Sequence, residues 1–252
     1  MPSTLRTLLR RLRNIVRPEA VVHRGMTLPS TFLRFGGQNF LDDEVFLQSG
    51  EKEAKRLQKD FGLKKEGAVL EIGCGYGRLP IGILSAIGPI STYQGVDVSD
   101  GAIQWCKRYI SKKHPSFCFL HINAHNKRYN PKGSAITTAF RLPLADHSFD
   151  IIYLYSVFSH MHSDEIRPYL KEFRRLLTPT GKVFLTAFVE KNVADEKENP
   201  KGYKQQWKGA LHCVRYSENF FRSFLAENGL RIHALHHGTE TDGQSALYLS
   251  LT

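Results

Sequence analysis

The sequence predicts an α/β fold in which helices cover both faces of a mostly parallel sheet. Two observations predict this fold. From residue 62 onward, short runs of β-branched and aromatic residues alternate with segments of helical periodicity. The first of these runs, residues 68–72, also leads straight into a glycine-rich turn followed by a helix. We therefore expect three layers, with the sheet between two layers of helices.

Seven strands are expected in this sheet. The last two apolar runs are joined by the turn-rich residues 238–243, which predicts a C-terminal hairpin with an antiparallel strand. The predicted strands cover residues 68–72, 92–97, 117–122, 149–155, 183–189, 231–237 and 246–251. The predicted helices cover residues 78–87, 101–113, 164–177 and 217–228, the last of them capped by Ser217 and closed by Gly229.

Residues 1–61 are expected to form an N-terminal helical segment ahead of a main domain over residues 62–252. A basic amphipathic helix precedes Pro18, residues 23–41 have an irregular pattern, and a second helix runs from Asp42 to Phe61. Residues 1–24 hold six arginines and one acid, which is +5 of the net charge of +11. The basic helix suits peripheral contact with an anionic membrane or a protein partner, or it folds back on the domain.

The cysteine spacing and the distribution of apolar residues predict a cytoplasmic location. The four cysteines have no paired spacing of the kind that disulfide frameworks or zinc sites use, which favours a reducing compartment. Arginines interrupt the apolar residues at the N-terminus, so no signal peptide is expected, and no apolar run is long enough to span a bilayer.

The turn Gly73-Cys74-Gly75-Tyr76-Gly77 carries the first functional signal. It follows a strand and opens a helix, so main-chain amides and a positive helix end face whatever binds at the edge of the sheet. This arrangement favours a nucleotide-like ligand. The dinucleotide fingerprint, however, needs a glycine at position 78, which is Arg78.

Four motifs in order resemble those of class I S-adenosylmethionine-dependent methyltransferases. Glu71-Ile72-Gly73-Cys74-Gly75-Tyr76-Gly77 resembles the first motif, and the second strand ends on an acid, Asp97, as it does in that family. Residues 141–152 resemble the approach to the family's fourth strand, and residues 176–183 the turn into its fifth. The resemblance implies a three-layer Rossmann-like methyltransferase fold and S-adenosyl-L-methionine as the cofactor.

The resemblance also implies roles for single residues. Asp97 would bind the ribose hydroxyls, the Gly73–Gly77 turn would approach the methionine portion, and Val98 would border the adenine. Asn123, where the family often has aspartate, could still hydrogen-bond the adenine amino group, with Ala124 beside it. The other residues expected at the cofactor are Glu71, Cys74, Arg78 and Tyr155.

The acceptor is expected beyond the fourth strand, where residues 155–162 lie at the carboxyl edge of the sheet. A histidine near neutral pKa suits removal of a proton from an acceptor hydroxyl or ammonium, so His160 is the candidate base and His162 the second. Either histidine could instead be a packing or capping residue, and Asp146 could orient or replace the base. His233, His236 and His237 lack companion ligands, so no metal is assigned.

The sequence therefore predicts methyl transfer to a small-molecule or glycan acceptor, with oxygen favoured over nitrogen. Residues 190–216 and the N-terminal segment would form the acceptor pocket and a lid. The basic N-terminus suggests RNA methylation as an alternative, but no appended recognition module accompanies it. Tyr155-Ser156-Val157 replaces the Pro-Pro-aromatic signature of DNA enzymes. A non-catalytic protein that binds the cofactor is the third possibility.

Two further segments, residues 101–106 and 126–133, resemble a bacterial subgroup of these methyltransferases. This resemblance points to a subgroup within the family but does not identify the substrate. The same subgroup has a Gly-Gly segment before its first helix, here Gly36-Gly37-Gln38-Asn39. That segment would lie near the ligand, or it would be an ordinary turn.

Overall fold

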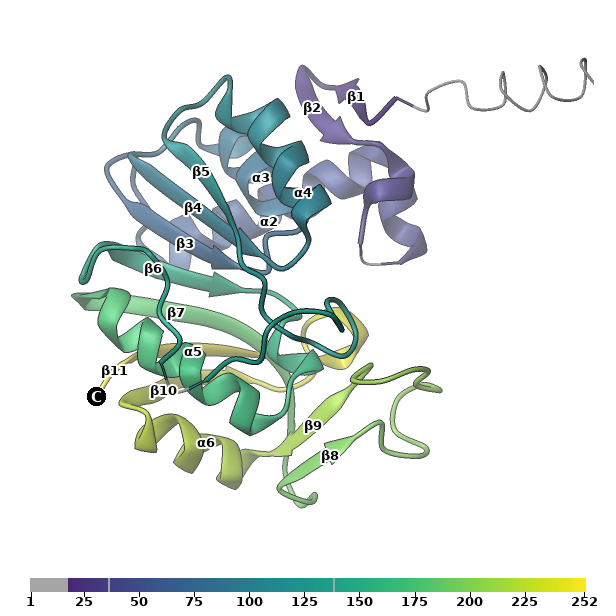
Figure 1. Cartoon of the computed structure of the whole chain (residues 1–252), viewed down its shortest axis with the longest axis vertical. Helices are drawn as coiled ribbons and strands as arrows, with labels where there is room; N and C mark the ends of the chain where they lie inside the picture. Colours follow the sequence, from purple (N-terminus) through teal and green to yellow (C-terminus); the bar gives the residue numbers. More distant parts are fainter. Residues whose placement is uncertain (1–17, 36, 138) are drawn as a thin grey trace, which may run out of the picture.

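The computed structural model describes residues 18–252 except residues 36 and 138 (Figure 1). The basic amphipathic helix expected before Pro18 lies outside the described residues. Strands β1 (Ala20–His23) and β2 (Met26–Pro29) then form an antiparallel hairpin, so the expectation of an irregular segment over residues 23–41 was wrong for its first part. Two four-residue strands joined at Gly25 are too short for an alternating pattern to reveal them. Two short 3₁₀ turns follow, η1 (Thr31–Leu33) and η2 (Gln38–Leu41).

In the described part of the chain the central sheet has nine strands, and seven of them, the number predicted, lie in the order β10-β11-β7-β6-β3-β4-β5. All neighbours from β7 to β5 pair in parallel, whereas β11 pairs antiparallel with both β7 and β10, which confirms the C-terminal hairpin. The strands are β3 (Ala68–Ile72), β4 (Thr92–Asp97), β5 (Phe117–His121), β6 (Phe149–Leu154), β7 (Leu177–Glu190), β10 (Leu230–His236) and β11 (Ser245–Leu251).

Helices cover both faces of this sheet, as predicted (Figure 1). Successive strand residues point to opposite faces, so Val69 joins one apolar core and Leu70 the other. The first core contains α2 (Asp43–Phe61), α3 (Arg78–Ala86) and α4 (Asp100–Cys106), and the second contains α5 (Ser163–Leu176) and α6 (Glu218–Glu227). The helix expected over residues 101–113 ends as a π-helical turn, η3 (Lys107–Ser111).

Helices α2 and α3 cross with their backbones in close contact, and this crossing sets one wall of the functional site. A Cβ atom on Gly82 would lie 2.1 Å from the carbonyl carbon of Gly50, and one on Gly50 would lie 2.3 Å from the carbonyl oxygen of Arg78. Glycine at both positions therefore brings α2 against the first turns of α3.

The insert over residues 190–216, expected to be irregular, contains two short strands instead. β9 (Val214–Ser217) pairs in parallel with the end of β7, and β8 (Glu196–Glu198) pairs antiparallel with β9. The sequence of β8 is entirely charged, so no apolar alternation marks it. Among the residues that the structure describes, no helix has the length and apolar character needed to cross a membrane.

Candidate active site

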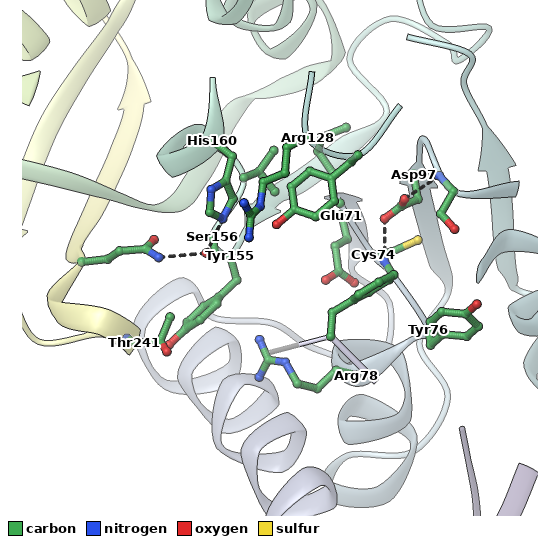
Figure 2. Close-up of a pocket in the computed structure, with 18 of the residues that line it drawn as sticks. Glu71, Cys74, Tyr76, Arg78, Asp97, Arg128, Tyr155, Ser156, His160 and Thr241 are labelled. Carbon is green, nitrogen blue, oxygen red and sulfur yellow. Dashed lines mark hydrogen bonds between the residues drawn. The ribbon is translucent and has the colours of Figure 1, made fainter. Parts of the chain in front are cut away.

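A large cavity lies at the carboxyl edge of the sheet, where β3, β4 and β6 end. Its volume is about 1010 Å³, at the upper limit of the about 300–1,000 Å³ typical of small-ligand sites. Its wall comes from α2, the glycine-rich turn, the ends of β4 and β6, and the loops near residues 125, 205 and 240. Figure 2 shows the labelled side chains around this space. A cavity of this size has room for a cofactor together with a second small molecule.

The turn after β3 brings main-chain amides to the cavity. Gly73 and Gly77 have φ angles of 77° and 80°, a region that residues with a side chain rarely adopt. A Cβ atom on Gly73 would lie 2.5 Å from the Cγ2 of Val157, so the loop after β6 leaves no room for one. Gly77 is the N-cap of α3, so the positive end of that helix lies at the cavity. The predicted strand, turn and helix are confirmed.

Asp97 is held at the cavity wall by two main-chain amides. The Gly75 amide donates to its Oδ2 at 2.7 Å, and the Ser99 amide donates to its Oδ1 at 2.8 Å (Figure 2). Burial raises the pKa of Asp97, and these hydrogen bonds oppose the rise. A carboxylate fixed in this way can accept from two neighbouring hydroxyls, so the residues present fit the ribose of S-adenosylmethionine.

Glu71 is buried below the same wall. Burial raises its pKa to about 8 although the Tyr93 hydroxyl is its hydrogen-bond partner. Glu71 is therefore mostly protonated at neutral pH. Its neutral carboxyl adds no net charge beneath the glycine turn.

Most of the other residues assigned to the cofactor also line this cavity. The Arg78 guanidinium lies 4.8 Å from the ring centroid of Tyr155, and its Nη1 donates to the Ser49 carbonyl at 3.2 Å. Asn123 lies outside the cavity lining, because Nδ2 of Asn130 donates to its Oδ1 at 3.1 Å. The predicted residues that line the cavity are Glu71, Gly73, Cys74, Gly75, Arg78, Asp97, Val98, Ala124, Tyr155 and His160.

His160 ends a short 3₁₀ turn, η4 (Phe158–His160), and is 8% exposed. Its Nδ1 lies 2.9 Å from the Leu211 carbonyl oxygen. Because a carbonyl can only accept, Nδ1 carries the proton and Nε2 is unprotonated. Burial and, to a smaller extent, the nearby Arg128 lower the pKa of His160 to about 4, although the hydrogen bond to the Leu211 carbonyl opposes this shift. The ring is therefore neutral at neutral pH and can accept a proton at Nε2.

A chain of polar groups continues from Nε2 of His160. The Ser156 hydroxyl oxygen lies 3.4 Å away, and it accepts a hydrogen bond from Gln244 Nε2 at 2.8 Å (Figure 2). Thr186 Oγ1 in turn donates to Gln244 Oε1 at 2.8 Å. These contacts connect the loop after β6, strand β7 and the residue before β11 next to the His160 ring.

His162, the second candidate, lies outside the cavity lining. Burial lowers its pKa, but hydrogen bonds to the Glu196 and Glu198 carboxylates more than compensate, so the pKa is raised overall. Glu198 also accepts from the Leu211 amide at 2.7 Å. His162 thus anchors the segment whose Leu211 carbonyl orients His160.

Sequence reasoning singled out residues 126–133, in the loop after β5, only for their resemblance to a subgroup and assigned them no place in the site. Oδ1 of Asn126 accepts from the amides of Arg128 and Tyr129 at 3.0 and 3.1 Å, while its Nδ2 donates to the His160 carbonyl at 3.0 Å. Asn126, followed two residues later by Arg128 and three residues later by Tyr129, is the sequence feature from which this turn could have been predicted. The insert also contributes Gln205 and His212 to the cavity. No cluster of three metal-ligating side chains occurs in the part of the chain that the structure describes.

Comparisons with known proteins agree with this geometry. Residues 70–183 match the family model described as a methyltransferase domain. A curated relative, the demethylmenaquinone methyltransferase of Staphylococcus aureus, is 28% identical over 129 residues, which are 51% of this chain and 46% of the relative. The match therefore spans about half the length of that relative.

Solved structures share the fold at low identity. The magnesium protoporphyrin IX methyltransferase of Synechocystis, solved with S-adenosylhomocysteine, is 18% identical with a TM-score of 0.56, over 87% of this chain and 90% of that one. The 1,6-didemethyltoxoflavin-N1-methyltransferase of Burkholderia thailandensis is 14% identical with a TM-score of 0.54, over 83% and 80%. The family match, the shared fold and the ordered motifs agree with the resemblance of residues 70–183 to class I S-adenosylmethionine-dependent methyltransferases.

Proposed function

We propose that this chain transfers a methyl group from S-adenosylmethionine to a hydroxyl oxygen of a small-molecule acceptor. The observation that carries this proposal is the unprotonated Nε2 of His160 in the wall of the same cavity as Asp97 and the glycine turn. The names of the relatives support the small-molecule part of this proposal, since they specify demethylmenaquinone, magnesium protoporphyrin IX and 1,6-didemethyltoxoflavin as acceptors of those proteins.

The chemistry divides between cofactor and protein. When bound, S-adenosylmethionine supplies an electrophilic methyl group, for which Asp97 and the Gly73–Gly77 turn would hold the cofactor. The acceptor hydroxyl must lose its proton as it attacks, and Nε2 of His160 is placed to take that proton. The donor hydrogen bond from Nδ1 to Leu211 stabilises the imidazolium that results.

The low pKa of His160 restricts the kinds of acceptor hydroxyl that it can deprotonate. A base with a pKa of about 4 is fully available at neutral pH but draws protons weakly. A phenol or enol, whose hydroxyl has a pKa of about 10 or below, suits it far better than the alkyl hydroxyl of a sugar. We therefore favour a phenolic or enolic small molecule over a glycan.

The cavity wall supports a small acceptor. Phe35 and Phe40 from the N-terminal segment line one side, and Gln205 and His212 from the insert line the other. These are the two segments from which we expected a lid. Together they leave a space suited to a small molecule, with His160 only 8% exposed.

Calorimetry with S-adenosylmethionine is the first test, because absence of binding would end every catalytic interpretation. A labelled-methyl assay then compares phenolic small molecules, a glycan extract and RNA. We expect label in the phenolic fraction and a 10²- to 10⁴-fold lower kcat for His160→Gln. Cofactor affinity should persist in that variant. His233→Gln, on the exposed strand β10, is the control and should keep full activity. Label in RNA alone, or a fully active His160→Gln, would refute the proposal.

A further inference from the structure

Arg128 is a positively charged residue that lines the cavity, and the proposed chemistry assigns it no role. It lies in the loop after β5, and Figure 2 shows its side chain reaching into the site on the same side as His160. Its Nε is buried and has no hydrogen-bond partner among the described residues. An unpaired donor on a partly desolvated guanidinium costs free energy, so the group is stabilised by a ligand that accepts from the guanidinium nitrogens facing the cavity.

The other arginines near the site are already engaged. Arg34 is bound to the Asp43 carboxylate and to main-chain carbonyls, and Arg78 stacks on Tyr155 and donates to Ser49. Arg56 and Arg215 each also have an unpaired buried nitrogen, but both pair with a carboxylate, Glu240 and Glu190 respectively. Arg128 differs from them because its guanidinium has no ion pair or hydrogen bond among the described residues, and it lies 5.5 Å from the centroid of the Tyr129 ring.

The loop holds Arg128 in a fixed relation to His160. Asn126 is 8% exposed, and its side chain accepts from the Arg128 amide while donating to the His160 carbonyl. The Tyr129 ring also packs edge-on against the His160 ring, with centroids 5.5 Å apart. A group bound at Arg128 is therefore presented at a set distance from the proton acceptor.

We propose that Arg128 binds an oxyanion of the methyl acceptor, a carboxylate or a phosphate, and so selects acidic acceptors. The inference rests on the proposed function of the same cavity. The planar guanidinium matches such an oxyanion with two parallel hydrogen bonds. Arg78, directly after the glycine turn, is the cation next to the expected methionine portion of the cofactor, whereas Arg128 lies in the loop that is bonded to His160. Anion binding would also offset the positive charge that lowers the pKa of His160, and so strengthen the base.

Calorimetry on the full chain saturated with S-adenosylhomocysteine tests this selection. The probes are benzoate, phenyl phosphate and benzamide, the last a neutral match for benzoate. We expect the wild type to bind at least one of the anions about 10- to 100-fold more tightly than benzamide. The preferred anion tells a carboxylate from a phosphate. Arg128→Gln should lose this preference, whereas Arg128→Lys should keep part of it.

Lys127→Gln is the matched control, because it removes the same charge from the same loop at an exposed residue outside the cavity lining. It should keep the anion preference. The inference is overturned if neither anion binds better than benzamide, or if Lys127→Gln loses as much as Arg128→Gln. It is also overturned if Arg128→Gln abolishes S-adenosylhomocysteine binding, which would place Arg128 at the cofactor. Failure of the proposed function is distinct, since it appears as absent S-adenosylmethionine binding or absent methyl transfer in the wild type.

Discussion

The substitution Gly82→Ala tests the backbone contact on which one wall of the cavity depends. The added methyl group would lie 2.1 Å from the Gly50 carbonyl carbon and 2.2 Å from its oxygen, both main-chain atoms of α2. Because neither atom can rotate away, α2 and α3 must separate by more than about 1 Å to reach van der Waals distance. Overpacking of this kind costs about 1–3 kcal/mol, and the main-chain neighbours favour the upper end. A loss of about 3 kcal/mol lowers Tm by about 6–12 °C in a chain of this size.

Gly101→Ala is the control, because it makes the same change in the first turn of α4. There the added methyl group meets only the Tyr76 hydroxyl, at 3.6 Å, which is ordinary contact. Alanine should stabilise that helix by about 0.4–1 kcal/mol. Both variants are measured by thermal unfolding and urea titration. Residues of α2 and α3 line the cavity, so Gly82→Ala should also weaken S-adenosylhomocysteine binding. A Gly82→Ala variant as stable as Gly101→Ala would show that the crossing yields easily and that our reasoning is wrong.

Three further predictions concern the ionisable groups. Asp97→Ala should weaken cofactor binding in calorimetry by about 10- to 100-fold, and an unchanged Kd would mean that the ribose contact is misassigned. Glu71 has a folded-state pKa of about 8 against an ordinary value of 4.5. The stability it contributes is therefore complete below pH 4.5 and is lost as pH rises to about 8, by up to about 5 kcal/mol. Glu71→Gln keeps an acceptor for Tyr93. Measured by urea titration, its free energy of unfolding should rise relative to that of the wild type between pH 5 and pH 8. If the two free energies change with pH in parallel, the prediction is contradicted. The acid limb of kcat/KM should fall near pH 4, because protonation of His160 abolishes its role, with activity recovered on return to pH 7.5. An acid limb near pH 6.5 would instead exclude His160 as the base.

Much of the fold could be predicted because its signals are local. The parallel strands β3, β4, β5 and β6 are runs of five or six residues with turn residues near their ends, so each was predicted to within one residue, whereas β7 begins six residues before its predicted start. The hairpin β1–β2 and the strand β8 carry no such signal. They form because a neighbouring segment offers hydrogen bonds, as β9 does for β8, and pairing between distant segments leaves no periodicity in either one.

The cofactor half of the site was predictable for the same reason. The glycine turn and Asp97 each lie immediately after a strand, and parallel strands bring their carboxyl ends to one edge. The hydrogen bond between Gly75 and Asp97 follows from that placement. Asn123 shows the limit of motif-based prediction, since the oxygen of its side-chain amide accepts a hydrogen bond from Asn130, seven residues away. The motif therefore located the residue correctly in the chain but could not give the direction of its side chain.

The acceptor half depends on contacts between segments that are far apart in sequence. His160 and His162 were the first and second candidates, and contacts with the insert distinguish them in the structure. The Leu211 carbonyl fixes the tautomer of His160, while Glu196 and Glu198 bind His162 outside the cavity lining. The ring of the proposed proton acceptor is thus oriented by a segment about fifty residues downstream. It follows that changes in the insert can alter the acceptor chemistry without changing the cofactor residues. Leu211, and Glu198 which accepts a hydrogen bond from its amide, are therefore positions at which acceptor preference can diverge among chains that share the glycine turn.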